Sequence, residues 1–264
     1  MGTEPKEGSI TSPYPENTPF YNLVMIAHME HNHERIRELV DWKLGENPQH
    51  PLALMTGYYA ALLSGDKITC EDYCERIFSL VAKAELHEDY TKLLELFKAH
   101  EHPQFEEVAK EMKKKSLNSN PREVDYGMTN WIGNIAVAIS KELAKDDPQY
   151  LDEIKQVPES WIETRTKHIL SEKNDDELVS IAQQLIEREI NKGEIDLTSL
   201  PHPLSDLYPI EIACGQSEVR VLLWKMVNAS VGFIITIEKN SETEDVYYPT
   251  KRLSENLLWF QTNG

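Results

Sequence analysis

The sequence predicts a mostly helical protein built from antiparallel helical hairpins, with a small β-hairpin near the C-terminus. Apolar residues recur at i, i+3 and i+4 along most of the 264 residues, and turns containing Pro or Gly separate these segments. Residues 231–238 break this pattern because they are β-branched and aromatic, and a polar turn links them to 246–248 as a possible partner strand. Since a two-stranded hairpin is marginal alone, we expect it to pack on the helices.

The best-defined predicted helix lies within residues 47–66. Asn47-Pro48 interrupts the preceding segment, Pro51 suits a first helical turn, and Gly65-Asp66 ends the helix. Gly57 falls in the helix interior, where glycine costs about 1 kcal/mol relative to alanine. A second helix packed closely against this position would explain it. The apolar positions at helical spacing are Leu54, Tyr58, Ala61 and Leu62.

This segment resembles the first helix of a tetratricopeptide (TPR) unit with its lead-in. With Gly57 as the family's glycine, Tyr73 matches an aromatic position of the second helix and Thr69 a small one, whereas Arg76 and Val81 depart from the family's Ala and Pro. The resemblance implies a helical-hairpin array of α-solenoid character, and an adaptor that holds peptides in a groove as an alternative function. The matching residues are Asn47, Pro48, Pro51, Ala53, Leu54, Gly57, Tyr58, Ala61, Leu62, Gly65 and Asp66.

The N-terminal part is expected to comprise a leader and a helical-hairpin region. Residues 1–18 are rich in Pro, Gly, Ser, Thr and Glu and predict a flexible leader. Residues 19–117 form the predicted N-terminal region, and Thr69 is the expected cap of the helix that follows 47–66. The other helices of this region are expected within 19–44, with a polar interruption at 28–35, and at 87–100 and 103–115.

Residues 118–121 form the best internal break, so 122–264 is the expected C-terminal region, although 19–264 could also be one continuous domain. Short connections favour antiparallel neighbouring helices. Residues 201–209 are expected as a loop, and a buried segment begins at Ile210–Cys214. The helices of this region are predicted at 131–143, 149–154, 158–170, 175–190 and 219–227, with a closing helix within 252–260.

The charge balance restricts the classes of partner. The formal net charge is −18 and the isoelectric point is about 4.9. Such a surface repels nucleic acids and anionic lipids, and it favours encounter with a basic protein, although acidity can also serve solubility alone. Three cysteines do not make a disulfide framework, and no apolar run approaches the ~18 residues of a membrane span. We therefore expect a soluble cytoplasmic protein without a cofactor.

The densest set of potential metal ligands is His28, Glu30, His31, His33 and Glu34. On a helix His28 and His31 share a face, whereas His33 points elsewhere. Glu30-x-x-His33 has the spacing of half a di-iron site, but the sequence has no second such motif. A solvated helix face is the main interpretation, and a metal-dependent enzyme using His28, His31 and Glu30 stays an alternative.

The remaining candidate chemistry involves cysteine and histidine. Cys70 and Cys74 could join His100 and His102 in a zinc site, but their spacing matches no common zinc motif. Cys214 could act as a nucleophile with His168 or His202 as its base, although a packing cysteine is the main interpretation. Phosphate-binding loops, nucleophile elbows, zinc-protease motifs and kinase motifs are absent from the sequence. We therefore expect a protein that is not an enzyme.

A helical scaffold with strong negative charge and without a catalytic motif indicates an interaction protein. Within that class, a stoichiometric inhibitor of a basic partner fits these features best. In charge, length, helical array and its closing segment, 209–214 leading to 233–249, the chain resembles the mostly helical immunity proteins of polymorphic toxin systems. That resemblance implies binding to a toxin, and toxins that act on nucleic acid tend to be basic. The predicted partner-binding residues are Glu142, Asp146, Asp147, Asp152, Glu153, Glu159 and Glu163.

Overall fold

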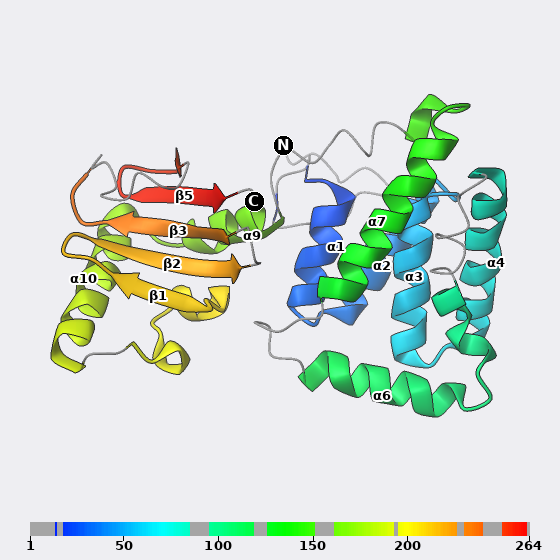
Figure 1. Ribbon diagram of the computed structural model, residues 1–264, viewed down its shortest axis with the longest axis horizontal. Coiled ribbons are helices and arrows are strands. Elements are labelled where there is room, and N and C mark those ends of the chain that lie inside the picture. The colour runs from blue at the N-terminus through cyan, green and yellow to red at the C-terminus, as the bar shows by residue number, and fades with distance from the viewer. Residues whose placement is uncertain are drawn as a thin grey trace, which may run out of the picture. The chain divides into compact units, whose positions relative to one another are not determined.

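A computed structural model describes residues 14, 18–84, 95–118, 126–150, 161–192, 195–225, 230–239 and 250–262. The chain forms two compact units, Met1–Trp161 and Ile162–Gly264 (Figure 1). We call them the helical unit and the sheet unit. The predicted leader, 1–18, lies largely outside the described residues, but the Tyr14 hydroxyl donates to Glu30 Oε1 at 3.5 Å. The expected break at 118–121 falls within the helical unit, and residues 119–125 lie outside the described ranges.

The helical unit is organised around α3, which packs against α2, α4, α6 and α7. Its core combines residues from these helices, among them Tyr58, Ile77, Ala109 and Ile135. In the described part of the chain, no helix is both long and apolar enough to cross a membrane. The elements are α1 (Phe20–Met29), α2 (His33–Glu46), α3 (Pro51–Ser64), α4 (Lys67–Ala84), α6 (Phe105–Asn118), α7 (Tyr126–Leu143) and the 3-10 helices η1 (Glu95–Glu101) and η2 (Pro148–Tyr150).

The ends and the interior of α3 agree with the sequence pattern, with one addition at the N-terminus. Gly65 ends the helix in the left-handed conformation, with φ of 72°. The N-cap is His50, whose Nδ1 accepts a hydrogen bond from the Ala53 backbone N–H at 3.1 Å. At Gly57, an added Cβ would lie 2.6 Å from the Tyr73 ring of α4. The expected close packing against Gly57 is therefore confirmed.

Two helix starts in this unit depend on short polar side chains. Asn32 caps α2 by accepting from the Arg35 backbone N–H at 3.0 Å, after a turn in which His31 has φ of 53°. The prediction that Thr69 caps α4 is wrong. Asp66 accepts from the Thr69 backbone N–H at 3.1 Å and from the Thr69 hydroxyl at 2.7 Å. The helix therefore begins at Lys67, because the carboxylate reaches the free N–H groups of the first turn.

The expected helices at 87–100 and 149–154 are described only in part. Residues 95–101 form η1 and 148–150 form η2, both of the 3-10 type, whereas 85–94 and 151–160 lie outside the described ranges. The described ends of these segments therefore have a tighter turn than the α-helix expected for them.

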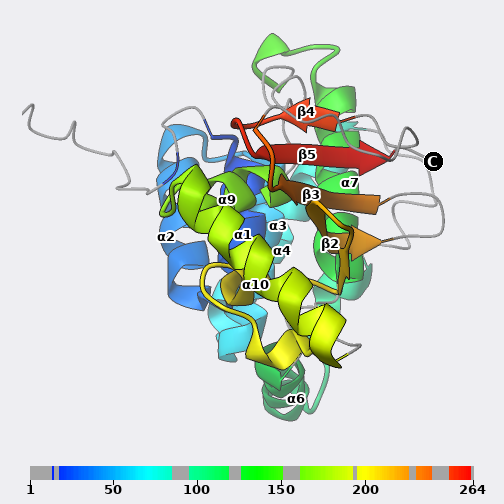
Figure 2. The same cartoon turned by 90° about the vertical axis from the view of Figure 1, so that its left-hand side faces the viewer.

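The sheet unit contains a five-stranded antiparallel sheet in the order β1-β2-β3-β5-β4. Helix α10 packs against β1, β2 and β3, and α9 adds Ile169 and Leu170 to the same core. Figure 2 shows both helices on one side of the sheet. The elements are α9 (Trp161–Leu170), α10 (Asp175–Lys192), η3 (Leu197–Ser199), η4 (Leu204–Leu207), β1 (Glu211–Cys214), β2 (Glu218–Lys225), β3 (Ser230–Thr236), β4 (Thr250–Arg252) and β5 (Leu257–Thr262).

The structure corrects two sequence predictions in this unit. In the segment expected as a helix at 219–227, residues 219–225 belong to β2, where Val219 and Val221 are buried against the helices, and 226–227 lie outside the described residues. The expected closing helix at 252–260 includes most of β5, whose residues 257–260 are buried on both faces. A short apolar run fits either period, and β-pairing with β3 decides between them. The predicted small β-hairpin is therefore part of a five-stranded sheet. The expected return strand at 246–248 lies outside the described residues.

Candidate functional site

Three of the predicted partner-binding carboxylates lie together at the C-terminal end of α7. Glu142 belongs to the last turn and is paired with Lys145. Backbone hydrogen bonds from the N–H groups of Asp146 and Asp147 to the Leu143 carbonyl, at 3.2 and 3.0 Å, continue the turn beyond the helix. Asp146 is exposed, and Asp147 is half-buried. Burial, followed by the negative charge of Asp147, raises the pKa of Tyr150.

This placement is electrostatically unfavourable for the helix itself. The C-terminus of a helix carries partial negative charge, and an acidic side chain there costs about 0.3–1 kcal/mol when exposed. Lys141 and Lys145 offset part of that cost. The stability of α7 therefore does not explain an acidic turn at this end of the helix.

The other four predicted binding residues do not add to this cluster in the described structure. Asp152, Glu153 and Glu159 lie outside the described residues. Glu163 belongs to α9 in the sheet unit, where its side chain is only 7% exposed. Its Oε1 accepts from Lys167 Nζ at 2.9 Å and from Lys251 Nζ at 3.0 Å. This carboxylate therefore joins α9 to β4 and offers little surface to a partner.

The histidine-rich turn between α1 and α2 does not assemble a metal centre from the described residues. His28 is buried and packs edge-on against Tyr59, with ring centroids 5.8 Å apart. Glu30 accepts from the Tyr14 hydroxyl. Within the described ranges, no three His, Cys, Asp or Glu side chains meet in a group that could hold a metal ion.

The residues of the hypothetical zinc site each have other contacts. Cys70 is buried, its Sγ donates to the Tyr58 carbonyl at 3.8 Å, and burial raises its pKa to about 12. His100 Nδ1 lies 3.3 Å from the Tyr58 hydroxyl, and the two rings pack edge-on. His102 Nδ1 instead accepts from the Gln104 backbone N–H at 3.1 Å. The Tyr58–His100 contact, between residues 42 positions apart, had no signal in the sequence pattern.

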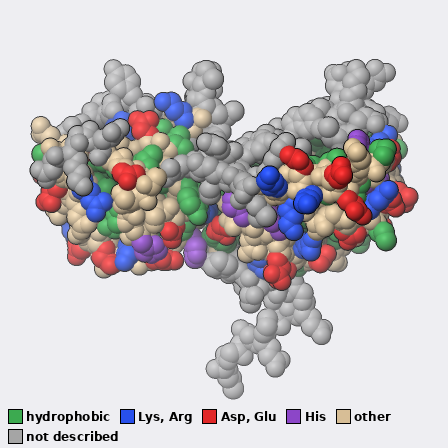
Figure 3. Space-filling view, turned by 90° about the horizontal axis from the view of Figure 1, so that it is seen from below, with side chains coloured by type: hydrophobic (Ala, Val, Ile, Leu, Met, Phe, Trp, Pro, Cys, Tyr) green, Lys and Arg blue, Asp and Glu red, His purple; other side chains and the backbone are tan. Residues whose placement is uncertain are grey.

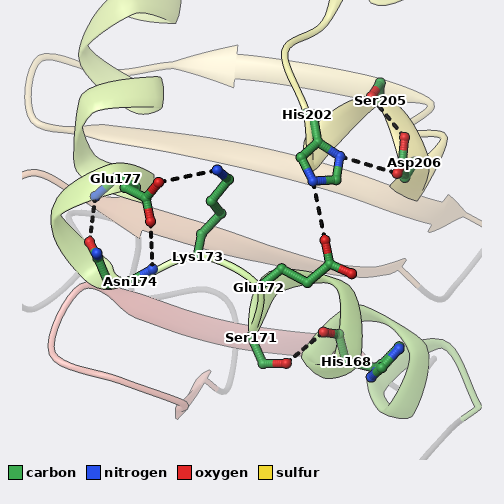
Figure 4. Close-up of polar contacts among 9 residues, drawn as sticks. All are labelled: His168, Ser171, Glu172, Lys173, Asn174, Glu177, His202, Ser205 and Asp206. Carbon is green, nitrogen blue, oxygen red and sulfur yellow. Dashed lines mark hydrogen bonds and ion pairs between the residues drawn. The ribbon is translucent and has the colours of Figure 1, made fainter. Parts of the chain in front are cut away.

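The described contacts do not support cysteine catalysis at Cys214. Burial, together with the hydrogen bond and charge of Glu189, raises the pKa of the Cys214 thiol to about 12, so the thiolate is scarce at neutral pH. His202, one proposed base, lies 3.2 Å from Asp206 through Nδ1 and 3.2 Å from Glu172 through Nε2 (Figure 4). Both ring nitrogens therefore face carboxylates. His168, the other proposed base, belongs to α9, and its backbone carbonyl accepts from Ser171 Oγ at 2.6 Å.

The fold and these contacts define a two-unit, mostly helical protein with an acidic turn after α7. No protein-family model, curated protein or solved structure matches the chain.

Proposed function

We propose that this protein is a non-catalytic interaction protein that binds a basic partner stoichiometrically, as an inhibitor of the immunity type. The supporting observation is the acidic turn after α7, in which Asp146 is exposed and Glu142 and Asp147 are half-buried, carried by a chain of net charge −18. A basic toxin that acts on nucleic acid is the expected partner class. The proposal includes a cytoplasmic location, which agrees with three free cysteines.

The acidic excess extends along the whole chain. Residues 1–161 contain 28 Asp and Glu against 17 Lys and Arg, a net of −11, and residues 162–264 contain 17 against 10, a net of −7. Charge of one sign on this scale steers an oppositely charged protein over distances near the Debye length, about 8 Å at physiological salt. Binding of this kind is expected to be fast at low salt and slower as salt rises.

The experiment that tests the proposal is capture of the tagged chain with its partner from the native host, followed by association kinetics. Converting Asp146, Asp147 and Asp152 together to Asn is expected to lower the association rate about tenfold at low salt and to flatten its salt dependence. The matched control converts Glu71, Glu75 and Glu111 to Gln. These side chains are exposed on α4 and α6. An equal effect in both triple variants would count against the α7 turn as the binding surface.

A TPR-like adaptor is the second candidate, because α3 and α4 pack through Gly57 and Tyr73 as the resemblance implies. The two candidates differ in partner. An adaptor would capture several proteins that share a short segment, whereas an inhibitor would capture one folded basic protein in equal amount.

A further inference from the structure

A pocket of about 210 Å³ opens in the helical unit between α2, α3 and the first turns of α4. Its volume is below the ~300 Å³ at which sites for drug-sized ligands begin, so its occupant would be small. The charged side chains that line it are Arg37, Asp41 and Asp66, and Thr69 and Tyr73 add hydroxyl groups. Figure 3 shows a similar mixture of cations and carboxylates on the helical unit. The pocket wall therefore offers both signs of charge to a ligand.

The two charged residues of α2 lie one helical turn apart along this wall. The short connection 47–50 makes α2 and α3 antiparallel neighbours, and an added Cβ on Gly57 would lie 3.0 Å from a Val40 methyl group. Arg37 precedes Val40 and therefore lies toward the C-terminal end of α3. Asp41 follows Val40 and therefore lies nearer Gly57. The rise of α2 separates the two charged residues by about 6 Å along its axis.

At the Arg37 end of the pocket a carboxylate accompanies the guanidinium. Asp66 follows the end of α3 and accepts from the Thr69 backbone N–H at 3.1 Å and from the Thr69 hydroxyl at 2.7 Å. These hydrogen bonds, and to a smaller extent the charge of Arg37, lower the pKa of Asp66, so its carboxylate is ionised at neutral pH. This end therefore presents a cation and an anion, which the carboxylate and the ammonium of an α-amino acid would match.

Toward the other end, Asp41 lines the pocket together with Tyr73. Burial, followed by the charge of Asp41, raises the pKa of Tyr73, so its hydroxyl stays protonated. The Arg37 guanidinium, the Asp41 carboxylate and the Tyr73 hydroxyl make no hydrogen bond or ion pair among the described residues. A ligand could therefore bind them without breaking a contact within the protein. With one cation and two carboxylates the wall has a net charge of −1, which a ligand with one carboxylate and two ammonium groups balances.

We propose that this pocket binds a basic α-amino acid of the size of ornithine or lysine. The Arg37 guanidinium donates to the α-carboxylate of the ligand, and Asp66 accepts from its α-ammonium group. Asp41 accepts from the ammonium group at the end of the ligand's side chain. The rise of about 6 Å between Arg37 and Asp41 is close to the distance that such a side chain spans. Each charge of the ligand then has a partner of opposite sign.

Isothermal titration calorimetry of the full-length chain with L-lysine, norleucine and 1,5-diaminopentane tests this site. Norleucine lacks the side-chain amine and the diamine lacks the carboxylate, so each is expected to bind at least about tenfold more weakly than lysine. Arg37→Gln is expected to weaken lysine about tenfold without weakening the diamine, because only lysine has a carboxylate. Asp41→Asn is expected to weaken lysine about tenfold and to leave norleucine unchanged, because norleucine has no side-chain ammonium group.

Arg35→Gln and Glu38→Gln are the matched controls, because they change charges on α2 that do not line the pocket. Both are expected to leave the affinity for lysine unchanged. Equal weakening in the control and pocket variants would overturn the site in favour of a general attraction of cations to an acidic chain. Heats that do not saturate with lysine would also overturn it, as would the diamine binding as tightly as lysine. The proposal does not depend on the partner-binding function, because the titration uses the chain alone.

Discussion

At Gly57 the backbone of α3 lies against an aromatic ring of α4. An added Cβ would lie 2.6 and 2.8 Å from Tyr73 ring carbons and 3.0 Å from a Val40 methyl group. Gly57→Ala is therefore expected to destabilise the helical unit by about 1–3 kcal/mol, although alanine is the better helix former. Urea unfolding measures the change. Gly45→Ala in α2 is the control, since nothing lies within 4 Å of its added Cβ, and it is expected to be neutral or stabilising by up to about 1 kcal/mol. A more stable Gly57→Ala variant would contradict the packing.

His50 gives the helical unit a dependence on pH. Burial, followed by the charge of Lys43, lowers its pKa from 6.5 to about 3. The unfolded chain therefore binds more protons than the folded chain between these pH values. The contribution of His50 is complete above pH 6.5 and is lost as pH falls toward 3, at a total cost of a few kcal/mol at most. His50→Asn keeps a capping side chain without this titration and is expected to flatten the stability profile below pH 6.5. An imidazole that titrates near pH 6.5 by NMR would contradict this.

At the scale of elements, Glu163 connects α9 to β4 through Lys167 and Lys251. Glu163→Ala removes the two charge-assisted hydrogen bonds of a buried carboxylate, while Lys167 and Lys251, 33% and 56% exposed, stay solvated. The variant is therefore expected to destabilise the sheet unit by about 1–2 kcal/mol. Glu142→Ala removes the exposed partner of Lys145 and is expected to cost less than about 1 kcal/mol. Chemical unfolding of both variants compares the two ion pairs. Equal costs would show that Glu163 contributes no more than a surface pair.

The spacing of apolar residues was sufficient to predict some helices but not the strands. Helix α3 could be predicted because Pro51, Gly65 and the apolar spacing between them act within the segment itself. β2 and β5 could not be predicted, because their apolar runs fit a helix as well as a strand. Pairing on both sides of β3 selects the strand. In the same way, the acidic turn after α7 was visible in the sequence, whereas the burial of Glu163 depends on Lys251, 88 positions away.

For the whole molecule, the net charge of −18 predicts self-repulsion in the folded state. Raising NaCl from about 0.02 to about 0.2 M shortens the Debye length and is expected to raise the thermal unfolding midpoint. Changing Glu71, Glu75 and Glu111 to Gln brings the charge from −18 to −15 and is expected to reduce the salt-dependent increase. Calorimetry over a salt series measures both. A midpoint that falls with salt would show that favourable ion pairs outweigh the repulsion.

The sequence by itself determined the mostly helical class, the position of α3 and the acidity of the chain, because these depend on composition, local spacing and helix-ending residues. The tertiary structure alone decided that the C-terminal region forms a five-stranded sheet and that Glu163 is buried. It also decided that Arg37 and Asp41 of α2 line one pocket with Asp66, Thr69 and Tyr73. Each of these features joins residues far apart in the chain, and one sequence records no distance between such residues.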